Sequence, residues 1–341
     1  MATKRKASID RLTHIVMGVL VVLAVVTGVV AFGVARDVFK SWTSTSLEGV
    51  AVPSDSQATQ APVGTPLPGN TTFQTSDGPT PTPWDGKNRV TVLVMGLDYR
   101  DWEAGGPPRT DTMILFTLDP VTNTAGILSI PRDMWVNIPG YDYYRINQAY
   151  FLGEADQLPG GGPALAMETV RQFLGVDINY YAQVDFYSFV KFVDILQGVK
   201  LDIPEDIKVS VIDQPDPVTI EAGRVTLPGD LALAYARARY TEGSDFDRAK
   251  RQQQVIMAVR DRVLDFNMLP TLIARSGDIY NELSAGIRTN MTMDDIMRLA
   301  YSAIQVPKEN IKQAQLGVDT VQFANVNGAD VLIPITDKVR E

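Results

Sequence analysis

Two aspartates stand at the ends of apolar runs, where a carboxylate can hold a metal ion or act as a base. Asp98 follows the run Val90–Leu97, and Asp111 directly precedes the run 112–118. Side chains at strand ends in open α/β sheets face the crevice in which ligands bind. Two carboxylates without His or Cys nearby suit Mg²⁺ or Mn²⁺, held partly by water and by substrate phosphate. The alternative is that both residues only form turns or cap helices.

Arginines accompany these aspartates at the ends of predicted elements. Arg237 and Arg239 stand two apart at the end of a predicted helix, where an extended continuation points both side chains the same way. Arg248 and Gln252 are four apart on the next helix and therefore share a face. Guanidinium groups that converge on one pocket can bind a pyrophosphate through bidentate hydrogen bonds. The candidate anion-binding set is Arg109, Arg132, Arg237, Arg239, Arg248 and Gln252.

The alternative role for these arginines is a set of surface salt bridges, which is the commoner case for an isolated Arg. Asp245 or Asp247 can also cap the helix that carries Arg248, and the N-terminus of that helix would itself favour an anion. The acidic partners available for salt bridges are Asp133, Asp245, Asp247 and Asp261.

The composition narrows the possible chemistry. The chain has no Cys and a single His, which is His14 near the N-terminus, so Ser-His-Asp catalysis, Cys-His catalysis and thiolate or imidazole metal sites are excluded. A formal net charge of −9 argues against a general nucleic-acid binder, which needs a basic surface. Any chemistry must therefore use carboxylates, cations, hydroxyls or an oxygen-bound metal.

The N-terminus predicts a membrane anchor. No residue between positions 15 and 35 is charged, and a helix of that length spans ~31 Å, the thickness of the hydrocarbon core of a bilayer. Lys4, Arg5, Lys6 and Arg11 precede the run, so the tail is predicted to be cytoplasmic and the rest of the chain to lie outside. The competing interpretation is a cleaved signal peptide, but the run is longer than a typical signal h-region, and Phe39-Lys40-Ser41 is a poor small-residue cleavage site.

A low-complexity segment separates the anchor from the ordered part. Residues 46–88 are rich in Pro, Ser, Thr, Gly and Gln without apolar periodicity, which is typical of a flexible linker. The predicted organisation is a cytoplasmic tail at 1–14, a transmembrane helix at 15–36, a linker at 37–88 and an extracytoplasmic domain at 89–341.

Within the domain, predicted strands and helices alternate. Strands are expected at Val90–Leu97, 112–118, 125–130, 181–184, Val199–Ile203 and 331–333. Helices are expected at 163–174, 186–196, 229–236, 245–266, 270–276 and 293–304. The short segment between 112–118 and 125–130 suits a hairpin, so the sheet is predicted to be mixed, in a layered α/β domain with helices on both faces.

These residues also occur within a recognisable order of motifs, and the chain from about Arg89 onward resembles the LytR–CpsA–Psr family. Arg145 stands where the family often has Lys, so positive charge is kept. The motifs are MGLD ending at Asp98, RTDTM from Arg109, SIPRD from Ser129, RINQAY from Arg145, VDF from Val184, AYARAR from Ala234 and DRAKRQQ from Asp247.

The resemblance implies a three-layer α/β/α sandwich around a mixed sheet, with an apolar pocket for a polyprenyl chain. It also implies a phosphotransferase on the outer face of the cytoplasmic membrane, which moves a glycopolymer from a polyprenyl diphosphate carrier onto peptidoglycan through a phosphodiester. By motif position, Asp98 and Asp111 correspond to the acids associated with Mg²⁺ (or Mn²⁺). The implied diphosphate-binding residues are Arg109, Arg132, Arg145, Arg237, Arg239, Arg248 and Gln252, with Arg132 also in the catalytic set.

In this interpretation an acceptor hydroxyl attacks phosphorus while the arginines and the metal neutralise charge on the phosphate oxygens. Asp98 or Asp111 can serve as the base, and the sequence does not decide between them. Two rival functions stay open: a metal-dependent pyrophosphatase that uses water as nucleophile, and a non-catalytic wall-binding or regulatory protein. The identity of the glycopolymer is not encoded in any recognisable motif.

Overall fold

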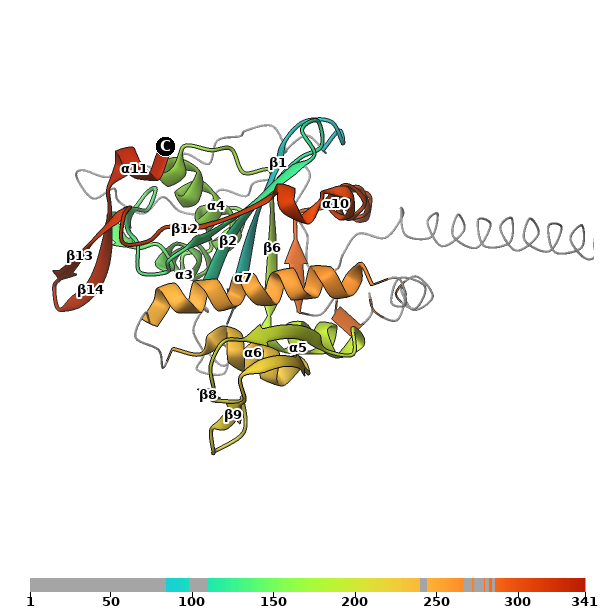
Figure 1. The fold of residues 1–341 in the computed structure, drawn as a ribbon. Helices are drawn as coiled ribbons and strands as arrows, with labels where there is room; N and C mark the ends of the chain where they lie inside the picture. Colours follow the sequence, from blue (N-terminus) through green and yellow to red (C-terminus); the bar gives the residue numbers. More distant parts are fainter. Residues whose placement is uncertain are drawn as a thin grey trace, which may run out of the picture. The chain divides into compact units, whose positions relative to one another are not determined.

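The computed structural model describes residues 84–97, 109–239, 244–265 and 286–340, together with positions 272, 279, 282 and 283 (Figure 1). The predicted tail, membrane helix and most of the linker lie outside these residues, as do Asp98 and nearly all of the predicted helix 270–276. Within the part of the chain that the structure describes, no helix combines the length and apolar character needed to cross a membrane.

A mixed six-stranded sheet forms the centre of the domain, in the order β11-β6-β1-β2-β3-β12. β1 pairs antiparallel with β2, which pairs antiparallel with β3, so the predicted hairpin is confirmed. β6 and β12 run parallel to β1 and β3, respectively. The strands are β1 (Val90–Leu97), β2 (Thr110–Asp119), β3 (Thr124–Ile130), β6 (Tyr180–Asp185), β11 (Ile287–Thr289) and β12 (Ile311–Gln315).

This topology brings separate segments to one edge of the sheet. Because β1 and β3 run in the same direction and β2 runs against them, the ends of β1 and β3 lie beside the beginning of β2. β6 runs parallel to β1, so its end lies next to the end of β1 at the same edge. β2 begins at Thr110, earlier than the sequence indicated, since a register shift next to Leu97 lets Thr110 pair with that residue. Asp111 therefore lies inside the strand and not before it.

One face of the sheet is covered by α3 (Gln148–Ala155) and α4 (Gly161–Leu174). Alternate residues of β1 and β2, such as Leu93, Met95 and Met113, point into this core, as the two-residue repeat of a strand requires. α4 begins at Gly161, two residues before the predicted Pro163, and it packs so closely on α3 that a Cβ at Gly162 would lie 2.5 Å from the Tyr150 carbonyl oxygen.

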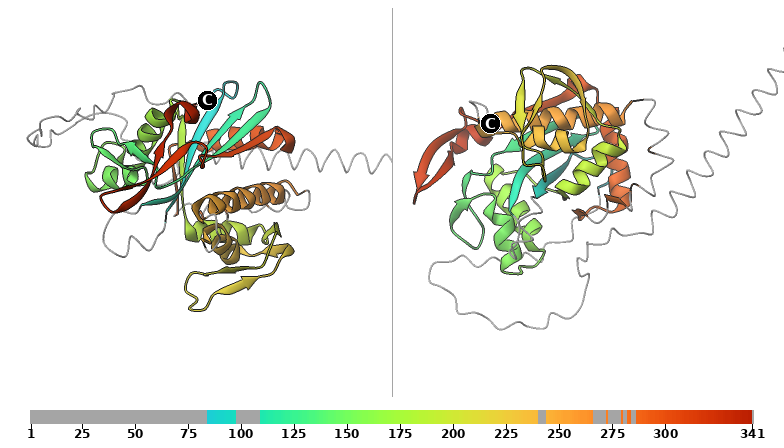
Figure 2. Two further views of the ribbon diagram at one scale, coloured as in Figure 1. Left: turned by 60° about the vertical axis from the view of Figure 1, so that its left-hand side comes forward. Right: turned by 90° about the horizontal axis from the view of Figure 1, so that it is seen from below.

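The other face is covered by α7 (Ser244–Val263) and α10 (Met293–Gln305). Met257 of α7 packs on Ile114 and Ile127 of the sheet, whereas Val255 and Ala258 face a second core. Figure 2 shows α7 lying between the central sheet and this smaller layer. The smaller layer comprises α5 (Phe186–Ile195), α6 (Gly229–Arg237) and two antiparallel strand pairs, β7 (Val199–Ile203) with β10 (Gly223–Leu227) and β8 (Ile207–Val209) with β9 (Val218–Ile220).

The remaining elements lie around the sheet. The predicted strand at 331–333 exists within β14 (Ala329–Pro334), but it pairs with β13 (Val321–Val326) and not with the central sheet. The sequence interpretation missed β12, whose residues IKQAQ lack an apolar pattern and whose position depends on pairing with β3. The other short elements are β4 (Trp135–Asn137), β5 (Tyr143–Arg145), η1 (Lys308–Asn310) and α11 (Thr336–Arg340).

Candidate active site

A cavity of about 660 Å³ opens at the edge of the sheet where β2 begins and β3 ends. Its lining joins side chains from β2, from the segment after β3, from the end of α6 and from α7. It therefore gathers predicted site residues that are far apart in the sequence. Those that line it are Asp111, Arg132, Arg237, Arg239, Arg248 and Gln252.

An ion pair joins Asp111 of β2 to Arg132, which follows β3. Arg132 Nη1 donates a hydrogen bond to Asp111 Oδ1 at 2.8 Å. The two side chains are 23% and 28% exposed, so the pair is partly shielded but open to a ligand. Arg132 Nε also lies 3.6 Å from Asp133 Oδ2. The guanidinium of Arg132 is thus held between two carboxylates at the cavity wall, which restricts its rotamer before any ligand binds.

The end of α6 presents the next two arginines. The helix ends at Arg237, and Ala238 takes an extended conformation with φ −57° and ψ 136°. Because the chain leaves the helix in this way, Arg237 and Arg239 both line the cavity, as their spacing predicted. The guanidinium carbon of Arg237 lies 4.7 Å from the centre of the Phe186 ring, a cation–π contact that orients it.

Helix α7 contributes Arg248 and Gln252 from one face. Arg248 Nη2 donates to the backbone oxygen of Asp111 at 3.4 Å, and Gln252 Nε2 donates to Thr112 Oγ1 at 3.0 Å. Both contacts fasten α7 to the start of β2. The helix begins at Ser244, so Asp245 and Asp247 lie within its first turn and do not precede it as capping residues would.

Other predicted site residues lie elsewhere. Arg145 does not line the cavity: β5 pairs with β4, and this places Arg145 Nε 3.3 Å from Asp133 Oδ1 and its Nη2 2.7 Å from the Asp330 carbonyl oxygen. Arg109 is exposed and stacks over Phe151, with 5.4 Å between guanidinium carbon and ring centre. Asp98 lies outside the described residues.

Sequence reasoning missed one wall of the cavity. The loop between β8 and β9, from Ser210 to Pro215, lines it and places Asp213 there with a positive φ of 64°. No periodicity or motif marks this loop, and its position depends on how the hairpin packs on α6. Phe186 belongs to the VDF motif, but nothing in that motif indicates its cation–π contact with Arg237.

The charge of the cavity indicates what it can bind. Four arginines line it, against two acids, Asp111 and Asp213, although the chain as a whole carries −9. Guanidinium groups recognise phosphate oxygens through paired N–H donors, and an anion with several oxygens can engage more than one guanidinium. The site therefore favours a diphosphate over a neutral ligand.

A divalent cation fits this site only if phosphate supplies much of its coordination. Among the described residues there is no group of three or more carboxylate or imidazole side chains that could hold a metal ion. Asp111 offers one carboxylate, whose Oδ1 is engaged by Arg132. Because Mg²⁺ in proteins commonly takes one or two carboxylates and completes its octahedron with water and phosphate, the donor set suits a metal shared with a bound diphosphate.

The fold and the cavity together define a mixed α/β domain with an arginine-lined cavity at one sheet edge. The LytR_cpsA_psr family model matches residues 54–341, and the chain belongs to this LytR–CpsA–Psr family.

Named relatives agree with this assignment. The polyisoprenyl-teichoic acid–peptidoglycan teichoic acid transferase TagU of Oceanobacillus iheyensis is 33% identical over 214 residues, which cover 62% of each chain. The regulatory protein MsrR of Staphylococcus aureus is 31% identical over 258 residues, covering 67% of this chain and 73% of that protein. The solved structure of TagT bound to LIIa-WTA matches with a TM-score of 0.60 at 27% identity, covering 76% of this chain and 90% of that one.

Proposed function

We propose that this chain is a membrane-anchored phosphotransferase that moves a glycopolymer from a polyprenyl diphosphate carrier onto peptidoglycan through a phosphodiester bond. Three findings support the proposal: membership of the family, the transferase names of relatives such as TagU, and the cavity. The observation that carries most weight is that four separate chain segments deliver arginines and a carboxylate to one 660 Å³ cavity.

The proposed reaction is a displacement at phosphorus. A hydroxyl oxygen of the peptidoglycan acceptor forms a bond to the glycan-bound phosphorus, and the bond from that phosphorus to the bridging oxygen breaks. Polyprenyl phosphate leaves with the bridging oxygen, and the hydroxyl proton passes to a carboxylate, Asp98 or Asp111. The arginines hold the diphosphate and neutralise charge that builds on its oxygens, the usual way in which proteins assist phosphoryl transfer.

Individual side chains have distinct parts in this scheme. Arg132 is already held by Asp111 and Asp133, so it meets the diphosphate with little loss of side-chain freedom. Arg237 and Arg239 approach from α6, and Arg248 and Gln252 approach from α7, so the anion is clamped between two helices and the sheet edge. Asp98 and Asp111 are the proposed ligands of Mg²⁺ (or Mn²⁺), which when bound supplies further neutralisation of the phosphate oxygens.

We also propose that residues 15–36 anchor the protein in the cytoplasmic membrane, with the tail inside and residues 37–341 outside. The uncharged run and the basic residues before it support this topology. It would place the cavity in the compartment of peptidoglycan and leave it tethered beside the lipid carrier. A reporter fused after residue 88 should be active only outside the cytoplasm, and the protein should stay in membranes after a salt wash. Release of the domain after cleavage near residue 40 would contradict the anchor.

The activity is tested with the full chain in detergent, a polyprenyl diphosphate-linked glycan as donor and peptidoglycan as acceptor. We expect polyprenyl phosphate to appear together with a phosphodiester-linked glycan, and the rate to depend on the acceptor. Release of the carrier at the same rate without acceptor would identify a pyrophosphatase instead. Binding of the donor without turnover under either condition would favour a regulatory protein.

A further inference from the structure

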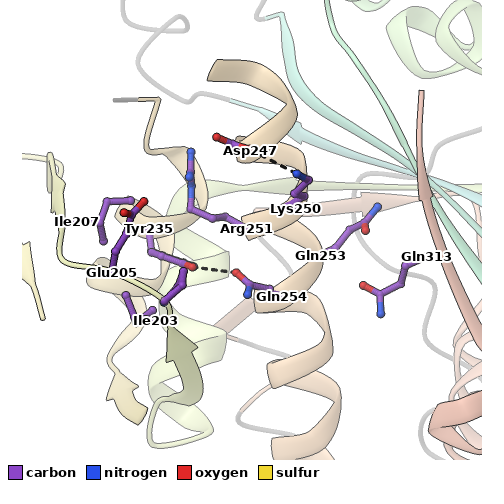
Figure 3. Close-up of a pocket in the computed structure, with 11 residues that line it drawn as sticks. Ile203, Glu205, Ile207, Tyr235, Asp247, Lys250, Arg251, Gln253, Gln254 and Gln313 are labelled. Carbon is purple, nitrogen blue, oxygen red and sulfur yellow. Dashed lines mark hydrogen bonds and ion pairs between the residues drawn. The ribbon is translucent and has the colours of Figure 1, made fainter. Parts of the chain in front are cut away.

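A second cavity, of about 380 Å³, lies beside α7, and its lining includes neither Arg248 nor Gln252. Figure 3 shows the residues that line it. Its walls come from the turn between β7 and β8, from α6, from α7 and from β12. None of its residues belongs to the predicted diphosphate set. The proposed transferase chemistry therefore leaves this cavity without a role.

The polar wall of the cavity is rich in amides. Gln254 Oε1 accepts a hydrogen bond from the Tyr235 hydroxyl at 2.8 Å, which turns Gln254 Nε2 into a positioned donor. Gln313 reaches the cavity from β12, where its side chain is exposed. Figure 3 shows both amides on the cavity lining. An amide both donates and accepts, so these groups match ligands that carry hydroxyl or acetamido groups.

The charges of this cavity balance. Lys250 and Arg251 stand against Asp247 and Glu205, and Lys250 Nζ lies 3.6 Å from Asp247 Oδ1. An anion would gain little here, in contrast to the larger, arginine-rich cavity. The balance favours a ligand that is largely neutral.

The opposite wall is apolar and is formed by Ile203, Pro204 and Ile207. A cavity with one apolar wall and a few placed polar groups fits a ligand with the same two-sided character. A sugar ring in its chair form has such a character, because its C–H groups form an apolar face while its hydroxyl and acetamido substituents point outward.

A direct contact links the two cavities. Arg251 of the second cavity is buried and donates from Nη2 to the carbonyl oxygen of Ala238. Ala238 lines the first cavity between Arg237 and Arg239. This hydrogen bond therefore connects a residue of α7 in the second cavity to the residue that follows α6 in the first.

We propose that the second cavity binds one N-acetylated sugar residue of a glycan chain while the first holds the diphosphate. This inference deepens the proposed function, because it gives the transferase a site for carbohydrate separate from its site for phosphate. The sugar could belong to the peptidoglycan acceptor or to the transferred glycopolymer, and both sources present the same chemistry.

The test is calorimetric titration of the full chain in detergent with three probes. One is the peptidoglycan disaccharide of N-acetylglucosamine and N-acetylmuramic acid, another is phosphate-free oligosaccharide released from the wall glycopolymer, and the third is inorganic diphosphate. Gln313→Ala and Gln254→Ala should each weaken the Kd for one of the two saccharides about five- to tenfold, as loss of one or two hydrogen bonds implies. The saccharide that loses affinity identifies the source.

The matched control is Gln305→Ala, which removes an exposed amide from α10 away from the cavity and should leave every Kd unchanged. The Gln313→Ala variant is the one least prone to misfolding, because the side chain of Gln313 is exposed. Circular dichroism verifies the fold of both variants. Unchanged saccharide affinity in both pocket variants, or no saccharide binding by the wild type, would overturn the inference. Diphosphate binding and acceptor-dependent transfer report separately on the proposed function, so either hypothesis can fail without the other.

Discussion

The two cavities beside α7 share a helix and differ in charge. The larger one has four arginines against two acids, whereas the smaller one sets Lys250 and Arg251 against Asp247 and Glu205. Positions 248 and 252 of α7 line the larger cavity, and positions 247, 250, 251, 253 and 254 line the smaller one. Helix α7 alone therefore does not set the class of ligand. The segments opposite it do, because Arg132, Arg237 and Arg239 add positive charge to the larger cavity only.

The largest expected effect concerns Arg132, the arginine held by two carboxylates. Arg132→Ala should lower acceptor-dependent transfer by roughly 10- to 150-fold, because a charge-assisted hydrogen bond contributes about 1.5–3 kcal/mol. Arg132→Lys should recover little, since an ammonium cannot make the bidentate contact. The measurement is the rate of polyprenyl phosphate release. The saccharide Kd of the second cavity should not move, and full activity in both variants would remove Arg132 from the site.

The next effect concerns metal dependence, which only the larger cavity should show. A chelator should abolish wild-type transfer, and Asp111→Ala should lower it about 10- to 100-fold, the range for groups that support a bound metal. Asp98→Ala and the double variant should match that loss, because residues that act as a unit are not additive. Chelator should leave the residual rate of the variants unchanged. Wild-type transfer that is insensitive to chelator would refute the metal assignment and leave the arginine site standing.

Substitution of Arg251 tests whether ligand binding in the two cavities is independent. Burial lowers the pKa of its guanidinium, while the nearby Tyr235 and Asp247 oppose that shift. Arg251→Met should cost about 1–3 kcal/mol of unfolding free energy, because the buried carbonyl of Ala238 loses its donor. It should also weaken the binding of diphosphate and of saccharide together, since the hydrogen bond that connects Arg251 of one cavity to Ala238 of the other is lost. Urea unfolding and titration measure both effects. A change in only one cavity would show that Arg251 does not couple them.

The smallest expected effect concerns the negative charge at the wall of the larger cavity. Asp213 is an exposed acid at the wall of the larger cavity, and its φ of 64° is one that Asn also tolerates. Asp213→Asn should tighten diphosphate binding about two- to threefold at low salt, as expected for a screened surface charge, and the gain should vanish at high salt. Titration at two ionic strengths gives the answer. Weaker binding in the variant would mean that Asp213 contacts the ligand or its metal.

Much of the fold could be predicted from local patterns. The strand Val90–Leu97 agrees with the structure at both ends, because a buried strand is a continuous apolar run that turn residues terminate. The shared face of Arg248 and Gln252 followed from helical spacing, and the extended exit from α6 aims Arg237 and Arg239 into one cavity. The motif order was sufficient to indicate the family that the chain belongs to.

The tertiary structure decided what depends on pairing between distant segments. Arg145 carries the charge and the motif of a site residue, but the β4–β5 pairing directs it to Asp133 and Asp330. β12 has a largely polar sequence, and its strand conformation depends on pairing with β3. The loop of the β8–β9 hairpin and the smaller cavity leave no periodic trace in the sequence, because their residues come from elements whose proximity is set by packing on α6 and α7. Local periodicity encodes which face of an element is buried. Which element covers that face is fixed by contacts between residues that are far apart in the chain.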